Sequence, residues 1–214
     1  MNTLKAIIFD NDGVLIHTEQ KFLELFLETA DILGIPYTRD DFIQHTFIEG
    51  WGSGGWLEQV GYSEEIQEKF KLTKAALLEK YMVNIESAPR TTEVLTELSY
   101  RYSLAVASNS PIDLILKLYK DIIPADVFTT IISRADYANP KPAPDAYAAA
   151  LKRLGVQANE AVVIEDSPRG IRAAQAAGIQ VVAIKNLAFP ELDQSVAEYQ
   201  ICELSELPSL LESL

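Results

Sequence analysis

The sequence predicts an α/β protein with a Rossmann-like parallel-sheet core and an inserted α-helical domain. From residue 89 onward, short apolar runs bounded by turn residues alternate with helix-like patterns, and one earlier run lies at residues 6–9. Strands buried on both faces of a parallel sheet give such continuous apolar runs. Residues 17–86 instead show helical spacing and no strand pattern. Alternating strands and helices imply right-handed βαβ units.

The first strand is expected at residues 6–9, where Ala-Ile-Ile-Phe runs into Asp-Asn-Asp-Gly. Residues i and i+2 of an extended chain point to the same side, so Asp10 and Asp12 can reach one small site. Two carboxylates this close repel each other unless a cation or a shared proton lies between them. By itself, the stretch is equally well explained as a strand followed by a common Asp/Gly turn.

Helical patterns fill the inserted segment. In the first helix, apolar side chains recur at spacings of three and four, and the pattern stops at Gly34. Ser63 is expected as the N-cap of the longest helix, whose lysines (69, 71, 74 and 80) are expected on a solvated face. The expected helices cover residues 19–33, 41–47, 57–60 and 63–81.

A glycine-rich stretch at residues 49–56 interrupts these helices and holds both tryptophans. Trp51 and Trp56 are expected in the core of the inserted domain. Glycines also permit a loop to approach a ligand closely or to move. The alternative is therefore a loop that faces the active site and selects the leaving group.

The elements after residue 89 are bounded by helix start and stop signals. Pro111 and Pro168 suit the first turn of a helix, and Gly155 and Gly178 end helices. Strands are expected at 103–107, 127–132, 161–164, 180–184 and 199–202, and helices at 92–100, 111–118, 145–154, 168–177 and from 205. The core is thus expected at residues 1–16 and 87–214, and the inserted domain at 17–86.

Composition excludes several classes of partner. The 214 residues carry a formal net charge of −13, which disfavours nonspecific binding to nucleic acid or to an anionic membrane. No apolar run approaches the roughly 18 residues of a membrane span. The chain has a single cysteine and cannot form an intrachain disulfide. Proteins of a reducing compartment commonly lack disulfides. We expect a soluble, cytoplasmic monomer that binds neither nucleic acid nor a membrane.

Polar side chains follow several of the predicted strands. They are Asp10 and Asp12, Ser108 and Asn109, Lys141, and Glu165 and Asp166. Ligands of open parallel sheets bind outside the carboxyl ends of the strands, so these groups are expected at one edge. Hard oxygen ligands suit Mg²⁺, and a lysine and a serine beside them suit a phosphate group. An aspartate can form an aspartyl phosphate while a second carboxylic acid moves the proton. The constellation predicts phosphoryl transfer.

Four segments, in this order, resemble the motifs of the haloacid dehalogenase superfamily of phosphohydrolases. They are Phe9-Asp10-Asn11-Asp12-Gly13-Val14-Leu15, Val106-Ala107-Ser108-Asn109-Ser110, Lys141-Pro142-Ala143-Pro144 and Val163-Ile164-Glu165-Asp166-Ser167-Pro168. The resemblance covers essentially the whole chain and extends to the phosphoglycolate phosphatase and β-phosphoglucomutase-like subfamily. It implies that the inserted helices form a cap over the active site.

The resemblance also implies a role at each matching position. Asp10 would be the nucleophile and a Mg²⁺ ligand, and Asp12 the general acid/base, with its backbone carbonyl on the metal. Ser108, with backbone amides near Asn109, would bind the transferring phosphoryl group, and Lys141 would bridge that group and Asp10. Asp166 would bind Mg²⁺, and Glu165 would do so directly or through water. Gly170 would let the helix that follows pack close to the sheet.

The expected function is that of a Mg²⁺-dependent phosphatase acting on a small phosphorylated metabolite, such as a sugar phosphate. Asp12 disfavours dehalogenation, because the dehalogenases lack this second aspartate. A hexose-phosphate mutase is the alternative, but residues 49–55 lack the arginine and Phe22 replaces the histidine that the resemblance implies for mutases. A non-catalytic binding protein ranks lower, since it has no need for both aspartates. His17 is expected at a hinge or at the substrate edge.

Overall fold

The computed structural model describes residues 4–213 and contains a parallel sheet with strand order β3-β2-β1-β4-β5-β6. The predicted fold class is confirmed. The strands are β1 (Ala6–Phe9), β2 (Ser103–Ala107), β3 (Thr130–Ile132), β4 (Ala161–Glu165), β5 (Gln180–Ile184) and β6 (Tyr199–Ile201). The helices of this part are α5 (Thr91–Ser99), α6 (Ile112–Tyr119), α7 (Asp145–Leu154), α8 (Pro168–Ala176) and α9 (Leu207–Leu211).

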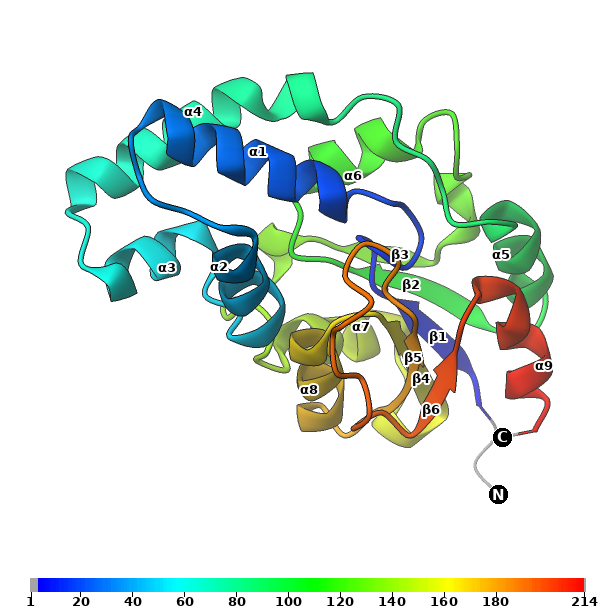
Figure 1. The fold of residues 1–214 in the computed structure, drawn as a ribbon. Helices are drawn as coiled ribbons and strands as arrows, with labels where there is room; N and C mark the ends of the chain where they lie inside the picture. The colour runs from blue at the N-terminus through cyan, green and yellow to red at the C-terminus, as the bar shows by residue number, and fades with distance from the viewer. Residues whose placement is uncertain (1–3, 214) are drawn as a thin grey trace. The chain divides into compact units, whose positions relative to one another are not determined.

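The central strand β1 is buried on both faces, which explains its unbroken apolar sequence. Ile8 belongs to the core cluster that contains Tyr147 of α7 and Ile171 of α8. Ile7 points to the opposite face, since successive side chains of a strand alternate. On that face α5 packs against β2, and α9 packs against α5 (Figure 1).

The chain divides into two compact units. One contains the described residues up to His17 and from Glu86 onward, and the other is Thr18–Ile85. Backbone hydrogen bonds join the two connections: the His17 N–H donates to the Glu86 carbonyl at 2.9 Å, and the Ala88 N–H donates to the Leu15 carbonyl at 2.9 Å. These paired connections form a short stem at the base of the inserted segment.

The expected strand at 127–132 is too long. Residues Ala125–Val127 form a 3₁₀ turn after Pro124, and pairing with β2 begins only near Thr130. The predictions at 103–107 and 180–184 agree with β2 and β5 at both ends.

The inserted unit consists of helices packed around aromatic side chains. Its elements are α1 (Glu19–Ile32), α2 (Arg39–Ile43), a π-helical turn (Gln44–Ile48), α3 (Gly52–Val60) and α4 (Glu64–Tyr81). The ring of Phe26 lies 5.3 Å from that of Phe42 and 5.9 Å from that of Phe70, measured between centroids. His45 is fully buried among these rings and forms a hydrogen bond with the Tyr37 hydroxyl.

Some expectations for this unit are wrong, and one holds only in part. The glycine-rich stretch is not all loop, because α3 begins at Gly52. Trp56 is 6% exposed, as expected, but Trp51 precedes α3 and is 44% exposed. Ser63 is the N-cap residue of α4, as expected, but its side chain makes no capping hydrogen bond. The Lys74 ammonium lies 4.8 Å from the ring centroid of Phe26 instead of on a fully solvated face, and burial lowers its pKa.

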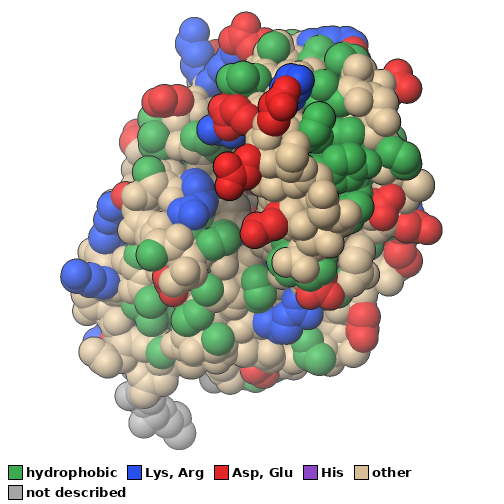
Figure 2. Space-filling view, turned by 90° about the vertical axis from the view of Figure 1, so that its left-hand side faces the viewer, with side chains coloured by type: hydrophobic (Ala, Val, Ile, Leu, Met, Phe, Trp, Pro, Cys, Tyr) green, Lys and Arg blue, Asp and Glu red, His purple; other side chains and the backbone are tan. Residues whose placement is uncertain are grey.

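Acidic and basic side chains are interspersed on the face of the molecule drawn in Figure 2, without a continuous basic surface there. Within residues 4–213, no helix combines the length and the apolar character needed to cross a membrane.

The two tryptophans provide a matched test of the inserted core. Trp56→Ala is expected to lower the free energy of unfolding by about 3–5 kcal/mol, because it empties a buried aromatic site. Trp51→Ala is expected to cost less than about 1 kcal/mol, because that ring is largely solvated. Urea unfolding followed by far-UV circular dichroism measures both. Equal losses would contradict the assignment of Trp56 alone to the core.

Candidate active site

Three neighbouring strands place the first functional side chains at one edge of the sheet. Asp10 follows β1, Ser108 follows β2, and Glu165 is the last residue of β4. In the register of the sheet, Phe9 of β1 is paired with both β2 and β4, so the three strand ends are adjacent. The Asp10 N–H still donates to the Ile164 carbonyl at 2.9 Å, which fixes the backbone from which the carboxylate projects. All of the site described below lies within the sheet-containing unit.

Lys141 is the most deeply buried cation of this edge, with 1% of its surface exposed. Its ammonium donates to Asp10 Oδ1 at 2.5 Å, to Glu165 Oε1 at 2.8 Å and to the Tyr147 hydroxyl at 2.8 Å. An ammonium has three N–H donors, and these three partners account for all of them. The position of Lys141 is therefore set from three sides.

Glu165 is engaged through both carboxylate oxygens. Oε1 accepts from Lys141 and, at 3.0 Å, from the Tyr147 hydroxyl. Oε2 accepts at 2.9 Å from each of three donors: the Asp166 N–H, the Ser167 N–H and the Ser167 hydroxyl. Direct coordination of a metal by Glu165 would have to displace one of these donors, so coordination through water suits this arrangement better.

Gly170 makes room for this carboxylate. A Cβ atom at residue 170 would lie 1.6 Å from Glu165 Oε1 and 1.9 Å from its Cδ. The glycine therefore accommodates a charged side chain of the site, which is a more specific reason for its presence than close packing of a helix on the sheet.

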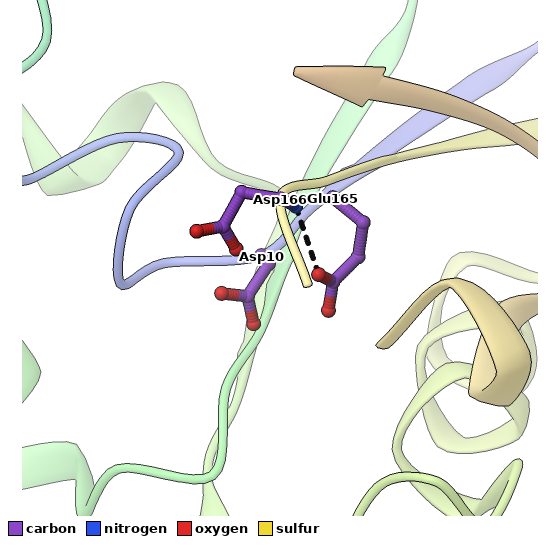
Figure 3. Close-up of side chains that lie close together, drawn as sticks. All are labelled: Asp10, Glu165 and Asp166. Atoms are coloured by element: carbon purple, nitrogen blue, oxygen red, sulfur yellow. Dashed lines mark hydrogen bonds between the residues drawn. The ribbon is translucent and has the colours of Figure 1, made fainter. Parts of the chain in front are cut away.

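Asp166 is oriented by two side chains that the sequence did not single out. Asn186 Nδ2 donates to Asp166 Oδ2 at 2.6 Å, and Gln194 Nε2 donates to the Asp166 carbonyl at 2.6 Å. Asn186 lies two residues beyond β5, so its position after a strand end could have indicated it as a candidate. Figure 3 shows the carboxylates of Asp10 and Asp166 turned to the same side, while Glu165 bends back toward the Asp166 N–H.

Asp12 and the loop after β2 form the next part of the site. Asp12 Oδ2 accepts from the Ser108 hydroxyl at 3.3 Å and from the Ser110 hydroxyl at 3.1 Å. Gly13, with φ of 89°, allows the turn directly after Asp12. Asn109 Oδ1 accepts from the Tyr137 hydroxyl at 2.6 Å, which fixes that side chain. Ser110 belongs to the second motif but was assigned no role from the sequence, and Tyr137 carried no signal of its own.

Negative charge exceeds positive charge in this buried group. Burial raises the pKa of Asp10 to about 7; the Lys141 ammonium opposes the rise, and the charges of Glu165 and Asp12 add to it. Burial also disfavours the ionised form of Glu165, but the charge and hydrogen bond of Lys141 hold its pKa below the ordinary value. Burial lowers the pKa of Lys141, yet the charges of Asp10 and Glu165 raise it more, so it stays an ammonium.

These residues fit a divalent cation. Asp10, Glu165 and Asp166 each offer an oxygen such that the three atoms lie within 4.8 Å of one another. Asp10 and Glu165 share one ammonium, and the charges of Glu165 and Asp12 add to the effect of burial in raising the pKa of Asp10, so an added cation would offset this repulsion. Carboxylate oxygens are hard ligands of the kind that Mg²⁺ prefers.

The family model of haloacid dehalogenase-like hydrolases matches residues 7–184. The chain belongs to this family. A phosphorylated carbohydrates phosphatase of Thermotoga maritima is 31% identical over 182 residues, which cover 83% of this chain and 83% of the relative. Fructose-1-phosphate phosphatase YqaB of Escherichia coli is 25% identical, with 85% of this chain and 97% of the relative covered. The chain is thus a haloacid dehalogenase-like phosphatase, a phosphoric monoester hydrolase.

One further relative and two crystal structures are also similar to this chain. SUPPRESSOR OF QUENCHING 1 of Arabidopsis thaliana is 33% identical over 85% of this chain, but this chain spans only 18% of that protein. Crystalline CbbY from Rhodobacter sphaeroides, in complex with phosphate, superposes with a TM-score of 0.76 at 25% identity, covering 96% of each chain. A putative β-phosphoglucomutase from Thermotoga maritima gives a TM-score of 0.70 at 27% identity, covering 99% of this chain and 100% of that one.

Gly170→Ala is expected to destabilise this haloacid dehalogenase-like hydrolase by about 2 kcal/mol or more, because the added methyl group collides with a buried carboxylate. Gly54→Ala is the control: it also adds a methyl group in a helix, but nothing lies within 4 Å of its Cβ position. Helix propensity predicts a neutral or slightly stabilising effect there. Chemical denaturation compares the two variants. A Gly170→Ala variant as stable as the Gly54→Ala control would show that Glu165 does not need this space.

Proposed function

We propose that the protein is a Mg²⁺-dependent phosphatase that hydrolyses a small phosphorylated metabolite of the sugar phosphate class through an aspartyl-phosphate intermediate on Asp10. The observation that carries the proposal is the placement of Asp10. Its carboxylate lies 2.5 Å from the buried Lys141 ammonium and within reach of Asp166, and Asp12 follows two residues later. The proposal also assigns residues 18–85 as the cap that closes over the substrate.

In the first proposed step, a carboxylate oxygen of Asp10 attacks phosphorus and the bond from phosphorus to the leaving oxygen breaks. Asp12 gives its proton to that oxygen, which departs as an alcohol. The ammonium of Lys141 stabilises the negative charge on the transferring group and on Asp10. The Ser108 hydroxyl, which already lies beside Asp12, donates to the phosphoryl oxygens.

In the second proposed step, Asp12, now a carboxylate, takes a proton from water, which attacks the phosphorus of the acyl phosphate. The bond from phosphorus to Asp10 breaks, so the carboxylate and inorganic phosphate are regenerated. The hydroxyls of Ser108 and Ser110 aim the Asp12 carboxylate in the absence of substrate. A protein that only bound phosphate would not need a second aspartate held in this way.

The carboxylates of Asp10 and Asp166, with the backbone carbonyl of Asp12, are the proposed Mg²⁺ ligands. When bound, Mg²⁺ supplies positive charge to the phosphoryl oxygens and offsets the repulsion among the carboxylates. Asn186 donates to one oxygen of Asp166 and so fixes the direction in which this carboxylate would face the ion.

The substrate class rests on the relatives. The Thermotoga maritima and Escherichia coli proteins are named for phosphorylated carbohydrates and for fructose 1-phosphate. The similarity to a putative β-phosphoglucomutase keeps a hexose-phosphate mutase as the second candidate. The absence of an arginine from residues 49–55 disfavours the mutase. Isomerisation of a hexose 1-phosphate with little release of phosphate would reverse this ranking.

Asp10→Asn is expected to lower kcat by at least about 1,000-fold, because the amide is a poor nucleophile. Phosphate release is measured with Mg²⁺ on an aryl phosphate and on a panel of sugar phosphates, phosphoglycolate and nucleotides. Removal of divalent ions by a chelator is expected to abolish turnover, and added Mg²⁺ to restore it. If wild type turns over no faster than Asp10→Asn on the whole panel, the catalytic proposal fails.

Asp166→Asn is expected to abolish measurable Mg²⁺ binding, whereas Asn186→Ala is expected to weaken it about 10-fold, because it removes only the group that orients the ligand. Calorimetric titration with Mg²⁺ in the absence of substrate measures both effects. Wild-type affinity in the Asp166→Asn variant would rule out Asp166 as a ligand.

A further inference from the structure

Tyr147 is a buried tyrosine whose hydroxyl belongs to the site although its ring belongs to the core. It lies on α7, is 0% exposed, and packs in the cluster that includes Ile8 of β1 and Ile171 of α8. Its hydroxyl accepts from the Lys141 ammonium at 2.8 Å and donates to Glu165 Oε1 at 3.0 Å. One end of the side chain is thus ordinary packing, and the other end contacts two charged groups of the site.

The three groups form a closed ring of hydrogen bonds. Lys141 donates to both Tyr147 and Glu165, and Tyr147 donates to the same Glu165 oxygen that Lys141 contacts. The Lys141 ammonium also lies 4.5 Å from the centroid of the Tyr147 ring, within the range of a cation–π contact. A ring of this kind fixes an ammonium more tightly than one ion pair, since any rotation of the lysine breaks a bond to a rigid helix or strand.

The third N–H of Lys141 is the one that meets Asp10. If the Tyr147 hydroxyl is lost, one N–H of an ammonium that is only 1% exposed has no acceptor, and water has little access to replace it. The ammonium then reorients so that all its N–H groups point toward the two remaining acceptors, the carboxylates of Asp10 and Glu165. The direction of the bond to Asp10 changes, although the charge of Lys141 does not.

We propose that Tyr147 is a positioning residue: its hydroxyl, together with Glu165, holds the Lys141 ammonium in the direction needed to stabilise the phosphoryl group on Asp10. The inference rests on the proposed function for its catalytic consequence. The geometry that it invokes can be tested without any substrate.

Tyr147→Phe is the decisive variant, because it keeps the ring in the core and removes only the oxygen. We expect kcat to fall about 10-fold, KM and the Mg²⁺ concentration for half-maximal activity to change by less than about 3-fold, and Tm to fall by no more than about 5 °C. Inhibition by vanadate, which imitates the five-coordinate phosphoryl group, is expected to weaken about 10-fold. The control is Tyr81→Phe, which removes a hydroxyl bonded to the Glu28 carboxylate in the inserted unit.

A direct readout of Lys141 separates this inference from the proposed function. In ¹⁵N-labelled protein the buried ammonium is expected to give a slowly exchanging NH₃⁺ signal, assigned by its loss in Lys141→Arg. Its exchange with water is expected to accelerate at least about 10-fold in Tyr147→Phe and to stay unchanged in Tyr81→Phe.

The outcomes separate cleanly. A lower kcat with faster ammonium exchange supports the positioning role. If Tyr147→Phe changes neither kcat nor the ammonium exchange, the positioning role is overturned. It is also overturned if activity is lost with unchanged ammonium exchange and a large fall in Tm, because that result marks a purely structural residue. If wild type has no activity that depends on Asp10, the proposed function fails by itself. In that case the ammonium exchange alone decides whether Tyr147 positions Lys141: faster exchange in Tyr147→Phe supports the inference, and unchanged exchange rejects it.

Discussion

The site depends on one buried ammonium placed among carboxylates. Lys141 contacts Asp10 and Glu165 directly. These two carboxylates lie at the carboxyl ends of β1 and β4, which are paired neighbours in the sheet. Without that ammonium, several negative charges would be buried beside one another at the sheet edge, an arrangement that costs several kcal/mol per unpaired ion. The ammonium offsets only part of the negative charge of the cluster, and the charge that remains favours a second cation at these carboxylates.

The strand ends explain why the sequence predicted so much of this site. Asp10, Ser108 and Glu165 each terminate an apolar run, and parallel strands bring their carboxyl ends to one edge wherever the intervening chain goes. The sequence can predict that these residues lie at one edge, because their position depends only on where each strand ends and on the strands being parallel. Asn186 follows the same rule after β5 and could have been found in the same way.

The remaining features depend on contacts that no local pattern encodes. The ring of Tyr147 is indistinguishable in the sequence from any apolar residue of α7, and only packing brings its hydroxyl to Lys141. The five donors around Glu165, and the space that Gly170 leaves for it, arise where separate turns meet. In the inserted unit, Trp51 and Trp56 have the same composition cues around them, and only the start of α3 decides which ring is buried.

The short stem at residues 15–17 and 86–88 determines how a change in the inserted segment would affect the core. Its backbone bonds hold the two ends of the inserted segment together, so the core closes whether the segment is long or short. The described residues of the candidate active site all belong to the sheet-containing unit, outside the inserted segment. A change in the length or sequence of the inserted segment would therefore leave the backbone that carries Asp10, Lys141 and Glu165 in place.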